Sequence, residues 1–237
     1  GQAPQDGRGR GQGPRGADPL ALDDHTGFVS IFDGKTLDNW EGDPAFWRVE
    51  GGAIVGQSTE QNPVKQNTFV IWRGGQPADF ELKVEFRMDA TNSGIQVRSV
   101  QLPPGPEIGK WVMKGYQADI DGRNRYTGQN YEERGRTFLA MRGQVTRLSE
   151  GRPPQIVGSL GATNDLVAVI KNEDWNEYHL IVDGNVMTHI LNGRVMSVVV
   201  DEDAQRRRLD GLLGVQVHVG PPMKIEYRNF RLKKLPN

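Results

Sequence analysis

The stretch "MKGYQADIDG" places three polar side chains at alternate positions: Gln117, Asp119 and Asp121. In a β-strand, successive side chains point to opposite faces, so these three share one face and the apolar residues between them face the other way. Carboxylates can transfer protons, and amides can hold sugar hydroxyls or a carbonyl oxygen. The alternation therefore predicts either a solvated strand face or a polar binding face.

Two further segments repeat this pattern. "SGIQVRS" places Gln96 and Arg98 on one strand face, and "GVQVHVG" does the same for Gln216 and His218. A face that only meets solvent is typically rich in Lys, Glu and Thr, whereas planar, directional groups suit the recognition of sugar hydroxyls. If the three strands lie in one sheet, their outer face forms a polar groove.

Nearby loops contribute further polar and aromatic groups. "YTGQNYEERGR" (126–136) supplies Tyr131 and Glu132, although its acidic and basic residues could also form a solvated turn with internal counter-charges. Trp111 lies in a loop flanked by Pro and Gly, which makes it the tryptophan best placed to stack on a sugar.

Other kinds of site receive less support. Asp119, Asp121 and Glu132 could hold one divalent cation through oxygen ligands, but their spacing matches no diagnostic loop. The four histidines include no close pair, and the absence of Cys removes thiol chemistry and cysteine-ligated zinc. There is no phosphate-binding loop with a Lys-Ser/Thr end and no serine nucleophile elbow.

Composition predicts an all-β protein. The chain has 237 residues, 36% of them hydrophobic, with 30 Gly and 14 Pro, which suits a turn-rich β fold better than a helical bundle. The formal net charge of −1 gives no field that would recruit nucleic acid or an anionic membrane. No apolar run is long enough to span a bilayer.

The period of two recurs along the chain. "DFELKVEFRMD" (79–89) places five apolar residues on one face and charged residues on the other, as in a half-buried strand. The other predicted strands are 28–32, 46–50, 53–57, 68–73, 94–99, 115–121, 136–142, 177–183, 186–191, 194–200, 211–218 and 223–233.

Turn and cap residues complete the predicted architecture. Asp183-Gly184 and Asn192-Gly193 are two-residue hairpin signals that would join three strands into a meander. One short helix is predicted over 163–171, with Thr163 or Asn164 as its cap. About a dozen strands with one helix favour a two-sheet antiparallel sandwich.

The first 26 residues differ from the rest of the chain. They are rich in Gly, Pro, Gln and Arg, so they are expected to form a tail or linker before a β-sandwich domain over 27–237. The chain begins at Gly1 without Met, from which we expect a processed start after export to the periplasm or cell surface. An ordered tail would instead dock on a neighbouring subunit in a homo-oligomer.

Eight segments in order resemble the 3-keto-disaccharide hydrolase domain family. They are "GFVSIFDGKTLDNW", "FWRVEGGAIVG", "DFELKVEFRM", "NSGIQVRS", "KGYQADI", "YEERGR", "DWNEYHLIVDGN…ILNG" and "GVQVHVGPPMKIEYRNFRLKKL", which together cover roughly residues 27–235. The resemblance implies a concanavalin-like jelly roll, usually in exported bacterial proteins, that acts on glycosides whose C3 hydroxyl has been oxidised to a ketone.

The implied reaction needs a base, an acid and a stabiliser for an enolate. A C3 ketone acidifies the C2 proton, so a base can remove it, the C1 substituent can leave, and water can add to the resulting enone. By analogy, His218 or Asp119 would be the base, Arg98 and Gln216 would stabilise the enolate, and Glu132 or Tyr131 would protonate the leaving group. A divalent cation could replace Arg98 in its role.

Two other functional classes fit the same sequence. The remaining members of the predicted substrate-binding set are Gln96, Gln117, Asp121 and Trp111, and these would serve a non-catalytic carbohydrate-binding module equally well. A structural subunit that assembles through its tail into an oligomer or filament is the third alternative. Sugar affinity without turnover would distinguish the module, and loss of assembly on deletion of residues 1–19 would distinguish the subunit.

Overall fold

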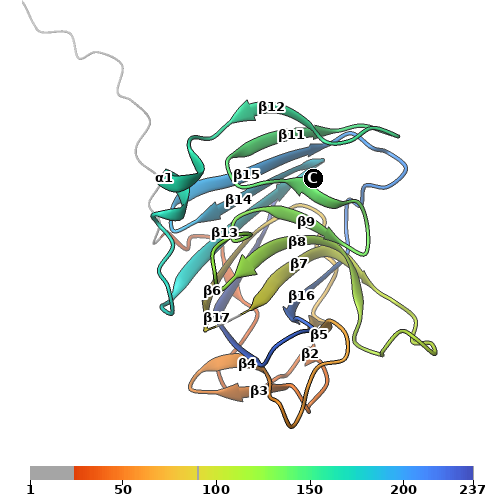
Figure 1. Ribbon diagram of the computed structural model, residues 1–237, viewed down its shortest axis with the longest axis vertical. Coiled ribbons are helices and arrows are strands. Elements are labelled where there is room, and N and C mark those ends of the chain that lie inside the picture. The colour runs from red at the N-terminus through yellow and green to blue at the C-terminus, as the bar shows by residue number, and fades with distance from the viewer. Residues whose placement is uncertain (1–23, 90, 237) are drawn as a thin grey trace, which may run out of the picture.

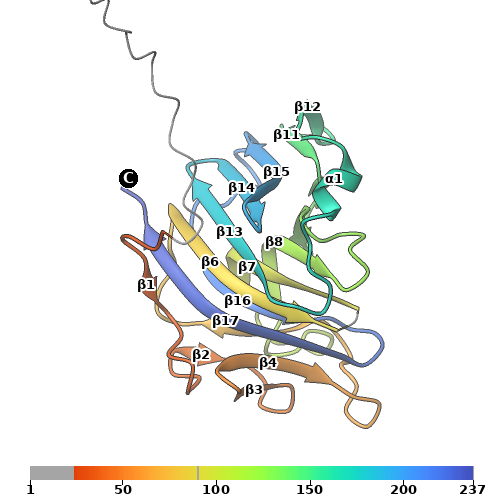
Figure 2. The ribbon, with the colours of Figure 1, turned by 90° about the vertical axis from the view of Figure 1, so that its left-hand side faces the viewer.

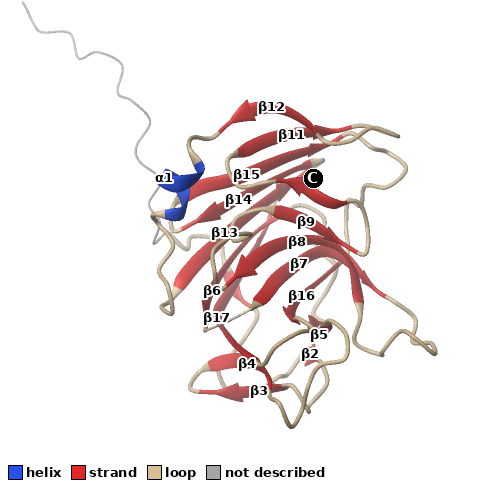
Figure 3. Ribbon diagram, in the orientation of Figure 1, coloured by secondary structure: helices blue, strands red, loops and turns tan. Residues whose placement is uncertain are grey.

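The computed structural model describes residues 24–89 and 91–236, which form two stacked β-sheets and one short helix (Figures 1 and 3). The larger sheet contains, in spatial order, β12 (Gln155–Ser159), β11 (Gln144–Leu148), β15 (Arg194–Asp201), β14 (Val186–Leu191), β13 (Asn176–Asp183), β6 (Phe80–Met88), β17 (Met223–Lys234), β4 (Ala53–Ser58) and β3 (Trp47–Glu50), with β1 (Val29–Ser30) also paired to β17. The smaller sheet contains β10 (Thr137–Ala140), β9 (Asn130–Glu133), β8 (Met113–Asp121), β7 (Asn92–Gln101), β16 (Leu212–Val217), β5 (Thr68–Trp72) and β2 (Trp40–Glu41). All described pairings are antiparallel except that of β11 with β15.

The predicted all-β sandwich is confirmed, and β6 shows why the sequence adopts it. Alternate residues of β6, among them Phe80 and Leu82, are buried between the sheets. The charged residues between them lie on the outer face and pair with neighbouring strands, as Glu85 does with Arg228 of β17. One face therefore supplies the core and the other supplies cross-strand ion pairs.

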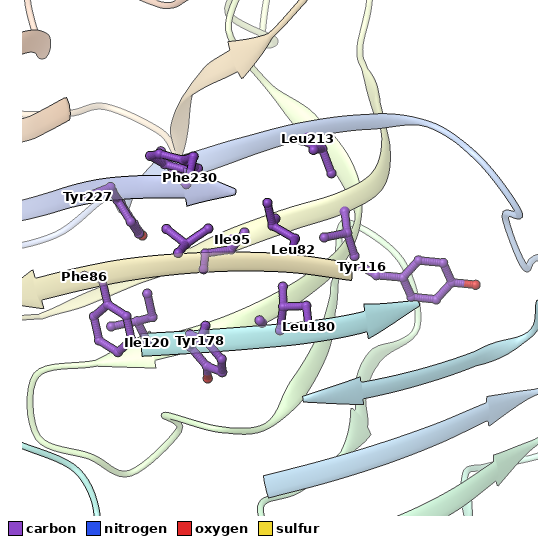
Figure 4. Packing of buried hydrophobic residues seen from close by; sticks show 14 of the residues in the cluster. Leu82, Phe86, Ile95, Tyr116, Ile120, Tyr178, Leu180, Leu213, Tyr227 and Phe230 are labelled. Carbon is purple, nitrogen blue, oxygen red and sulfur yellow. The ribbon is translucent and has the colours of Figure 1, made fainter. Parts of the chain in front are cut away.

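The core fills the space between the two sheets. Figure 2 views the sandwich with β6, β13 and β17 in front of β7 and β16. The buried side chains that meet there include Leu82, Phe86, Ile95, Tyr116, Ile120, Tyr178, Leu180, Leu213, Tyr227 and Phe230 (Figure 4). Both sheets contribute, so the inner face of the smaller sheet is fixed by packing and its outer face is the one available for function.

Both predicted hairpins are present, but the turn of the first is Gly184-Asn185, one residue later than predicted, and the helix prediction is partly wrong. β13, β14 and β15 form a meander in which Asn192 and Gly193 both have positive φ, as a two-residue turn requires. Helix α1 covers only Thr163–Val167, and its N-cap is Ala162 without a side-chain cap hydrogen bond. Thr163 therefore lies inside the helix, and the chain leaves helical geometry before the predicted end.

Four strands were not predicted: β2, β9, β11 and β12. β2 is only two residues long, and β12 is an edge strand whose residues are mostly exposed, so neither shows clear alternation. β9 lies in the segment that the sequence analysis interprets as a loop, so the sequence assigns no strand face to its acidic residues.

Several predictions concern residues outside the described part of the chain. The N-terminal tail prediction falls largely on residues 1–23, and no structural statement is made about them. Within the described residues, no helix is long and apolar enough to cross a membrane.

Candidate functional site

The three strands with alternating polar residues are neighbours in the smaller sheet, in the order β8, β7, β16. Their register places Gln96 opposite Gln117 and Gly94 opposite Asp119. Ile95 and Ala118 of the same strands belong to the core, so the polar side chains lie on the face that points away from it. The three strands therefore lie in one sheet, as the prediction of a shared polar face required.

This outer face is strongly curved. Asn67, which precedes β5, donates from Nδ2 to Oε1 of Glu133 on β9 at 3.0 Å. Three strands lie between β5 and β9, so in a flat sheet these two strands would be about 19 Å apart at the usual strand spacing of about 4.8 Å. The side chains can meet only because the sheet curls inward, and the curvature buries polar groups that a flat sheet would expose.

The buried amides form a directed chain of hydrogen bonds. Ser99 Oγ donates to Oε1 of Gln96 at 2.5 Å, and Gln96 Nε2 donates to Oε1 of Gln117 at 2.7 Å. Gln117 Nε2 then donates to Oδ1 of Asp119 at 2.6 Å, and Gln129 Nε2 donates to Oδ2 of the same carboxylate. Each amide orientation is fixed by the next, and Asp119 is the common acceptor.

Gly94 makes room for this chain. A Cβ placed on Gly94 would lie 2.5 Å from Cδ of Gln117, because the Gln117 side chain crosses directly over the glycine. The residue opposite Asp119 must therefore lack a side chain. We refer to Gln96, Gln117, Asp119, Gln129, Glu133 and Gln216 together as the polar face.

Asp119 has the electrostatic character of a proton-transfer group at neutral pH. Its side chain is only 4% exposed. Burial raises its pKa to about 7, the donors Gln117 and Gln129 partly offset that rise, and the negative charges of Glu133 and Asp121 add to it. A carboxyl group with such a pKa can both accept and release a proton near pH 7.

Glu133 is a second buried carboxylate on the polar face. The sequence analysis selects its neighbour Glu132 instead. Glu133 accepts from Asn67 and, at 3.5 Å, from Gln216 Nε2. Tyr131 shares its face, and the Tyr131 phenol has a pKa raised by burial and then by the charges of Glu133 and Asp119. Had residues 130–133 been recognised as a strand, the period of two would have placed Tyr131 and Glu133 together on this face.

Glu132 does not belong to the polar face. It lies opposite Tyr116, whose side chain is part of the core, so it points to the inner side of the sheet. Its carboxylate accepts from Arg136 Nε at 2.6 Å. The placement of Glu132 among the groups around the substrate is therefore wrong, because adjacent residues of a strand face opposite ways.

Arg98 is also absent from the polar face, which corrects its predicted position beside Gln96. Its φ of 44° lies in the left-handed region, within a bulge that interrupts the pairing of β7 with β8. The guanidinium consequently points to one end of the sandwich, where it donates to the carbonyls of Ala78 and Gly184 and pairs with Asp79 at 2.7 Å. These contacts give it a structural role between the two sheets.

The other predicted residues lie at the margins of the polar face. Asp121 accepts backbone hydrogen bonds from Arg123 and Arg125 and so holds the turn after β8. His218 directly follows β16, is partly exposed, and has its Nδ1 beside the carbonyl of Val219. Both are therefore close to the polar face along their strands without joining its hydrogen-bond chain.

Trp111 lies on the outer side of the same sheet, toward β5. It packs on a small buried cluster of Phe69, Ile71 and Met113 and borders a hollow of about 340 Å³. Lys110 Nζ stands 4.4 Å from the Trp111 ring centroid, so one ring face is already occupied.

Aromatic rings form an exposed rim on the β9–β10 side. Phe138 is 47% exposed, and its ring centroid lies 5.3 Å from that of Tyr131 and 6.1 Å from that of Tyr126. Because Tyr131 also belongs to the face that carries Gln117, this rim is continuous with the polar face.

The residues proposed for a divalent cation are not brought together. Asp119 and Asp121 share a face, but Glu132 is directed to the other side of the sheet. No group of three or more His, Asp or Glu side chains with suitable geometry occurs in the described part of the chain. These three carboxylates, which the sequence offered as possible ligands of one cation, therefore do not form a common site.

A curved β-sandwich with buried amides and carboxylates on one sheet is the architecture of the jelly-roll class. The chain belongs to the 3-keto-alpha-glucoside-1,2-lyase-like domain family, whose model matches residues 27–233. The resemblance predicted from the sequence is confirmed, and the chain is thereby placed among carbohydrate-related β-sandwich proteins. A comparison with curated protein sequences found no match.

Solved structures share the fold at low sequence identity. A proposed glycosyl hydrolase from Parabacteroides distasonis is 17% identical, with a TM-score of 0.56, and the match covers 88% of this chain and 99% of that one. The carbohydrate-binding module CBM66 from Bacillus subtilis is 12% identical, with a TM-score of 0.52 and coverage of 83% and 96%. A Bacillus subtilis protein of unknown function with a galectin-like fold is 13% identical, with a TM-score of 0.53 and coverage of 84% and 90%. At these identities the likeness extends to the fold alone.

Proposed function

We propose that the protein is a carbohydrate-active enzyme that cleaves 3-keto-glycosides by proton abstraction, elimination and hydration. Family membership supports the substrate class. The observation that carries the proposal is the buried Asp119 carboxyl group, whose pKa of about 7 suits reversible proton transfer at neutral pH.

The reaction has two stages, elimination of the C1 substituent and then hydration. A base takes the proton from C2 of the 3-keto sugar, and the electron pair of that bond forms the enolate. The enolate then expels the C1 oxygen, which takes up a proton and leaves as an alcohol, so a 1,2-ene-3-ketone remains. Addition of water returns a proton to C2 and a hydroxyl group to C1, and the sum is hydrolysis of the glycosidic bond.

The polar face suggests which groups perform these steps. Asp119 is the proposed base, because its two donors hold both carboxylate oxygens in place while burial keeps its proton affinity high. Glu133 and Tyr131 are the proposed proton donors to the leaving oxygen, and the Gln216 amide is the proposed donor to the enolate oxygen. Arg98 and Glu132 receive no role, since neither faces this side of the sheet.

A turnover assay with 3-keto-glucosides tests the proposal. Asp119→Asn should lower turnover by at least about 100-fold, which is typical for loss of a general base. Glu41→Gln, which changes an exposed carboxylate on β2, is the matched control and should leave turnover unchanged. His218→Gln tests whether His218, the other base that the sequence suggested, removes the C2 proton instead of Asp119. Loss in the His218 variant alone would transfer the role to His218, and inertness of the wild-type protein toward all 3-keto substrates would refute the enzyme proposal.

Carbohydrate binding without turnover is the second candidate, and the exposed aromatic rim favours it. The Phe138 ring is exposed beside the half-buried Tyr126, whereas the amides of the polar face are almost fully buried. Under this alternative, Phe138→Ala would weaken sugar binding and no substrate would be cleaved. Turnover that is lost on Asp119→Asn would exclude a purely binding role.

Export and oligomerisation through residues 1–26 stay predictions. Deletion of residues 1–19 followed by measurement of mass in solution tests the second of them: an unchanged oligomeric state would show that these residues do not mediate assembly.

A further inference from the structure

A basic cavity lies at the end of the smaller sheet, away from the polar face. Its volume is about 520 Å³, larger than the hollow beside Trp111, and its lining residues come mainly from β8, the β9–β10 turn and the connection between β15 and β16. Figure 1 labels β8, β9, β15 and β16. Its lining residues include six cationic side chains, which are Lys114, Arg134, Arg136, Arg206, Arg207 and Arg208. We call it the arginine cavity.

Positive charge exceeds negative charge in and around this cavity. Glu132 is the acidic residue among the described lining residues. Asp201 and Asp203 are buried partners of lining arginines, and the exposed Asp210 lies near Arg208. Six cations thus face four carboxylates, in a chain whose formal net charge is −1. The excess is local, and a concave surface of one sign concentrates counter-ions.

The base of the cavity is rigid. Arg136 pairs with Glu132 at 2.6 Å and with Asp201 at 2.7 Å, and Tyr116 donates its hydroxyl to the same Asp201 at 2.6 Å. These groups are almost fully buried. Arg136 is therefore neutralised by its own partners and serves to hold the floor of the cavity in place.

The cations nearer the opening have few partners. Lys114, Arg134 and Arg207 form no ion pair within the described residues, and Arg208 approaches Asp210 only to 3.8 Å. The Nε of Arg208 is buried without a hydrogen-bond acceptor in the described part of the chain. A buried donor without a partner is costly, so the Arg208 guanidinium is incompletely satisfied by the described residues.

The backbone positions these cations before any ligand arrives. The Arg208 amide donates to the Tyr116 hydroxyl at 3.2 Å, and the Arg208 carbonyl accepts from Arg98 Nη1 at 3.4 Å. Arg134 has a φ of 55° in the tight β9–β10 turn, and a Cβ at the next residue, Gly135, would lie 2.5 Å from Cδ of Glu132. Both arginine-bearing loops are thus anchored to the network beneath the cavity.

From this arrangement we infer that the arginine cavity binds a multiply charged oxyanion of the phosphate or sulfate type, with room for the molecule that carries it. Guanidinium groups match such oxygens with paired, charge-assisted hydrogen bonds. The cavity volume exceeds what a lone tetrahedral oxyanion fills, so an ester of a small molecule such as a sugar is the expected ligand. This inference does not depend on the proposed turnover, because the polar face and the arginine cavity use different residues.

Isothermal titration calorimetry with the full chain tests the inference. The probes are glucose 6-phosphate, glucose 6-sulfate, inorganic phosphate, inorganic sulfate and neutral glucose, at an ionic strength where exposed charges are screened beyond about 8 Å. We expect both esters to bind more tightly than the inorganic ions, and glucose not to bind through this cavity. A preference for one ester would identify whether phosphate or sulfate is the recognised group.

Substitutions test whether the cavity binds esters through particular residues or only through its overall positive charge. Arg134→Gln and Arg207→Gln remove cations that have no ion-pair partner, so the fold should be retained, and each should weaken ester binding about tenfold. Arg194→Gln, at the exposed β14–β15 turn, is the matched control and should have no effect. Absence of binding for every oxyanion, or equal weakening by the control variant, would overturn the inference.

Discussion

Replacement of Asp119 by Asn should stabilise the protein increasingly as the pH rises from 3.8, the ordinary pKa of an Asp carboxyl group, to about 7, and should have little effect below 3.8. In the folded state burial raises the pKa of Asp119 from 3.8 to about 7. The folded protein therefore holds a proton that the unfolded chain has already released between these two values. Stability contributed by this proton is present at low pH and is lost as the pH rises through the folded pKa.

The magnitude follows from the shift. A difference of about three units corresponds to about 4 kcal/mol of unfolding free energy, at about 1.4 kcal/mol per unit. Part of this difference appears below about pH 4.5, where the unfolded carboxyl is still partly protonated. About 3 kcal/mol of it should appear between about pH 4.5 and about pH 8.5. The Asn variant lacks this titration, so its stability relative to wild type should rise by that amount over the same interval.

The substitution is compatible with the local hydrogen bonds. Asn retains an oxygen to accept from Gln117, while its amide nitrogen would face the Nε2 of Gln129. The Oε1 of Gln129 has no partner among the described residues, so a rotation of that amide would present an acceptor instead. The rotation would exchange the unpaired Oε1 of Gln129 for the Nε2 of the same amide, so the variant should fold with no more unpaired buried groups than the wild type.

Urea unfolding followed by tryptophan fluorescence across this pH range measures the effect. Asp203→Asn is a control of opposite sign. Burial opposes ionisation of Asp203, but Arg206 outweighs it and lowers the pKa, so the control should be less stable than wild type at neutral pH and should converge with it as the pH falls below 3.8. Parallel pH profiles for wild type and Asp119→Asn would refute the assignment of a raised pKa to Asp119.

Four further substitutions, in three tests, probe the geometry. Gly94→Ala should displace the Gln117 side chain and cost about 1–3 kcal/mol of stability, measured by urea unfolding; unchanged stability would contradict the close approach. Arg98→Met should lower stability by about 3–5 kcal/mol, because its buried ion pair is broken, and a calorimetric melt that is unchanged would show that the arginine does not join the two sheets. Glu133→Gln should reduce turnover more than it reduces stability, whereas Glu132→Gln should do the reverse; equal behaviour in the two assays would show that the two faces of β9 are not functionally distinct.

The sequence was sufficient to assign the two faces of a strand where the alternation of apolar and polar residues was long and uninterrupted. β6 shows the period of two over nine residues and β8 shows it from Tyr116 to Asp121, so their faces were assigned correctly and the polar side of β8 was found. The prediction depended on the physical rule that one face must be apolar to form a core. It succeeded for Asp119 because Ile120 and Ala118 beside it are unmistakably core residues.

The failures have two local causes. β9 is short and polar, with the sequence "NYEE", so it resembled a loop, and the choice between Glu132 and Glu133 had no periodic basis. Arg98 follows three correctly alternating residues, but the bulge after Val97 reverses the expected direction of its side chain. Neither a bulge nor the end of a short strand leaves a regular pattern in the sequence.

Curvature is the third cause, and it is not a local property. The sequence indicated an open polar groove, whereas Gln96 and Gln216 are fully buried. Burial arises because side chains from Asn67 and Glu133, which are 66 positions apart in the chain, meet across the curled sheet. Without this burial the Asp119 carboxyl would have an ordinary pKa. Its raised pKa, which makes it a candidate base, could therefore be inferred only from the three-dimensional structure.

Strand β8 connects the two proposed sites through adjacent residues. Gln117 points outward to Asp119, while Tyr116 points inward and donates to Asp201 beneath the arginine cavity. Polar groups are consequently buried on both faces of one strand, which a sheet can tolerate only when nearly every donor and acceptor is paired. The packing of β8 against the larger sheet supplies that rigidity, and it fixes both networks at once. A change that shifts β8 along its register should therefore disturb the polar face and the arginine cavity together, whereas changes in the flanking loops should affect only one of them.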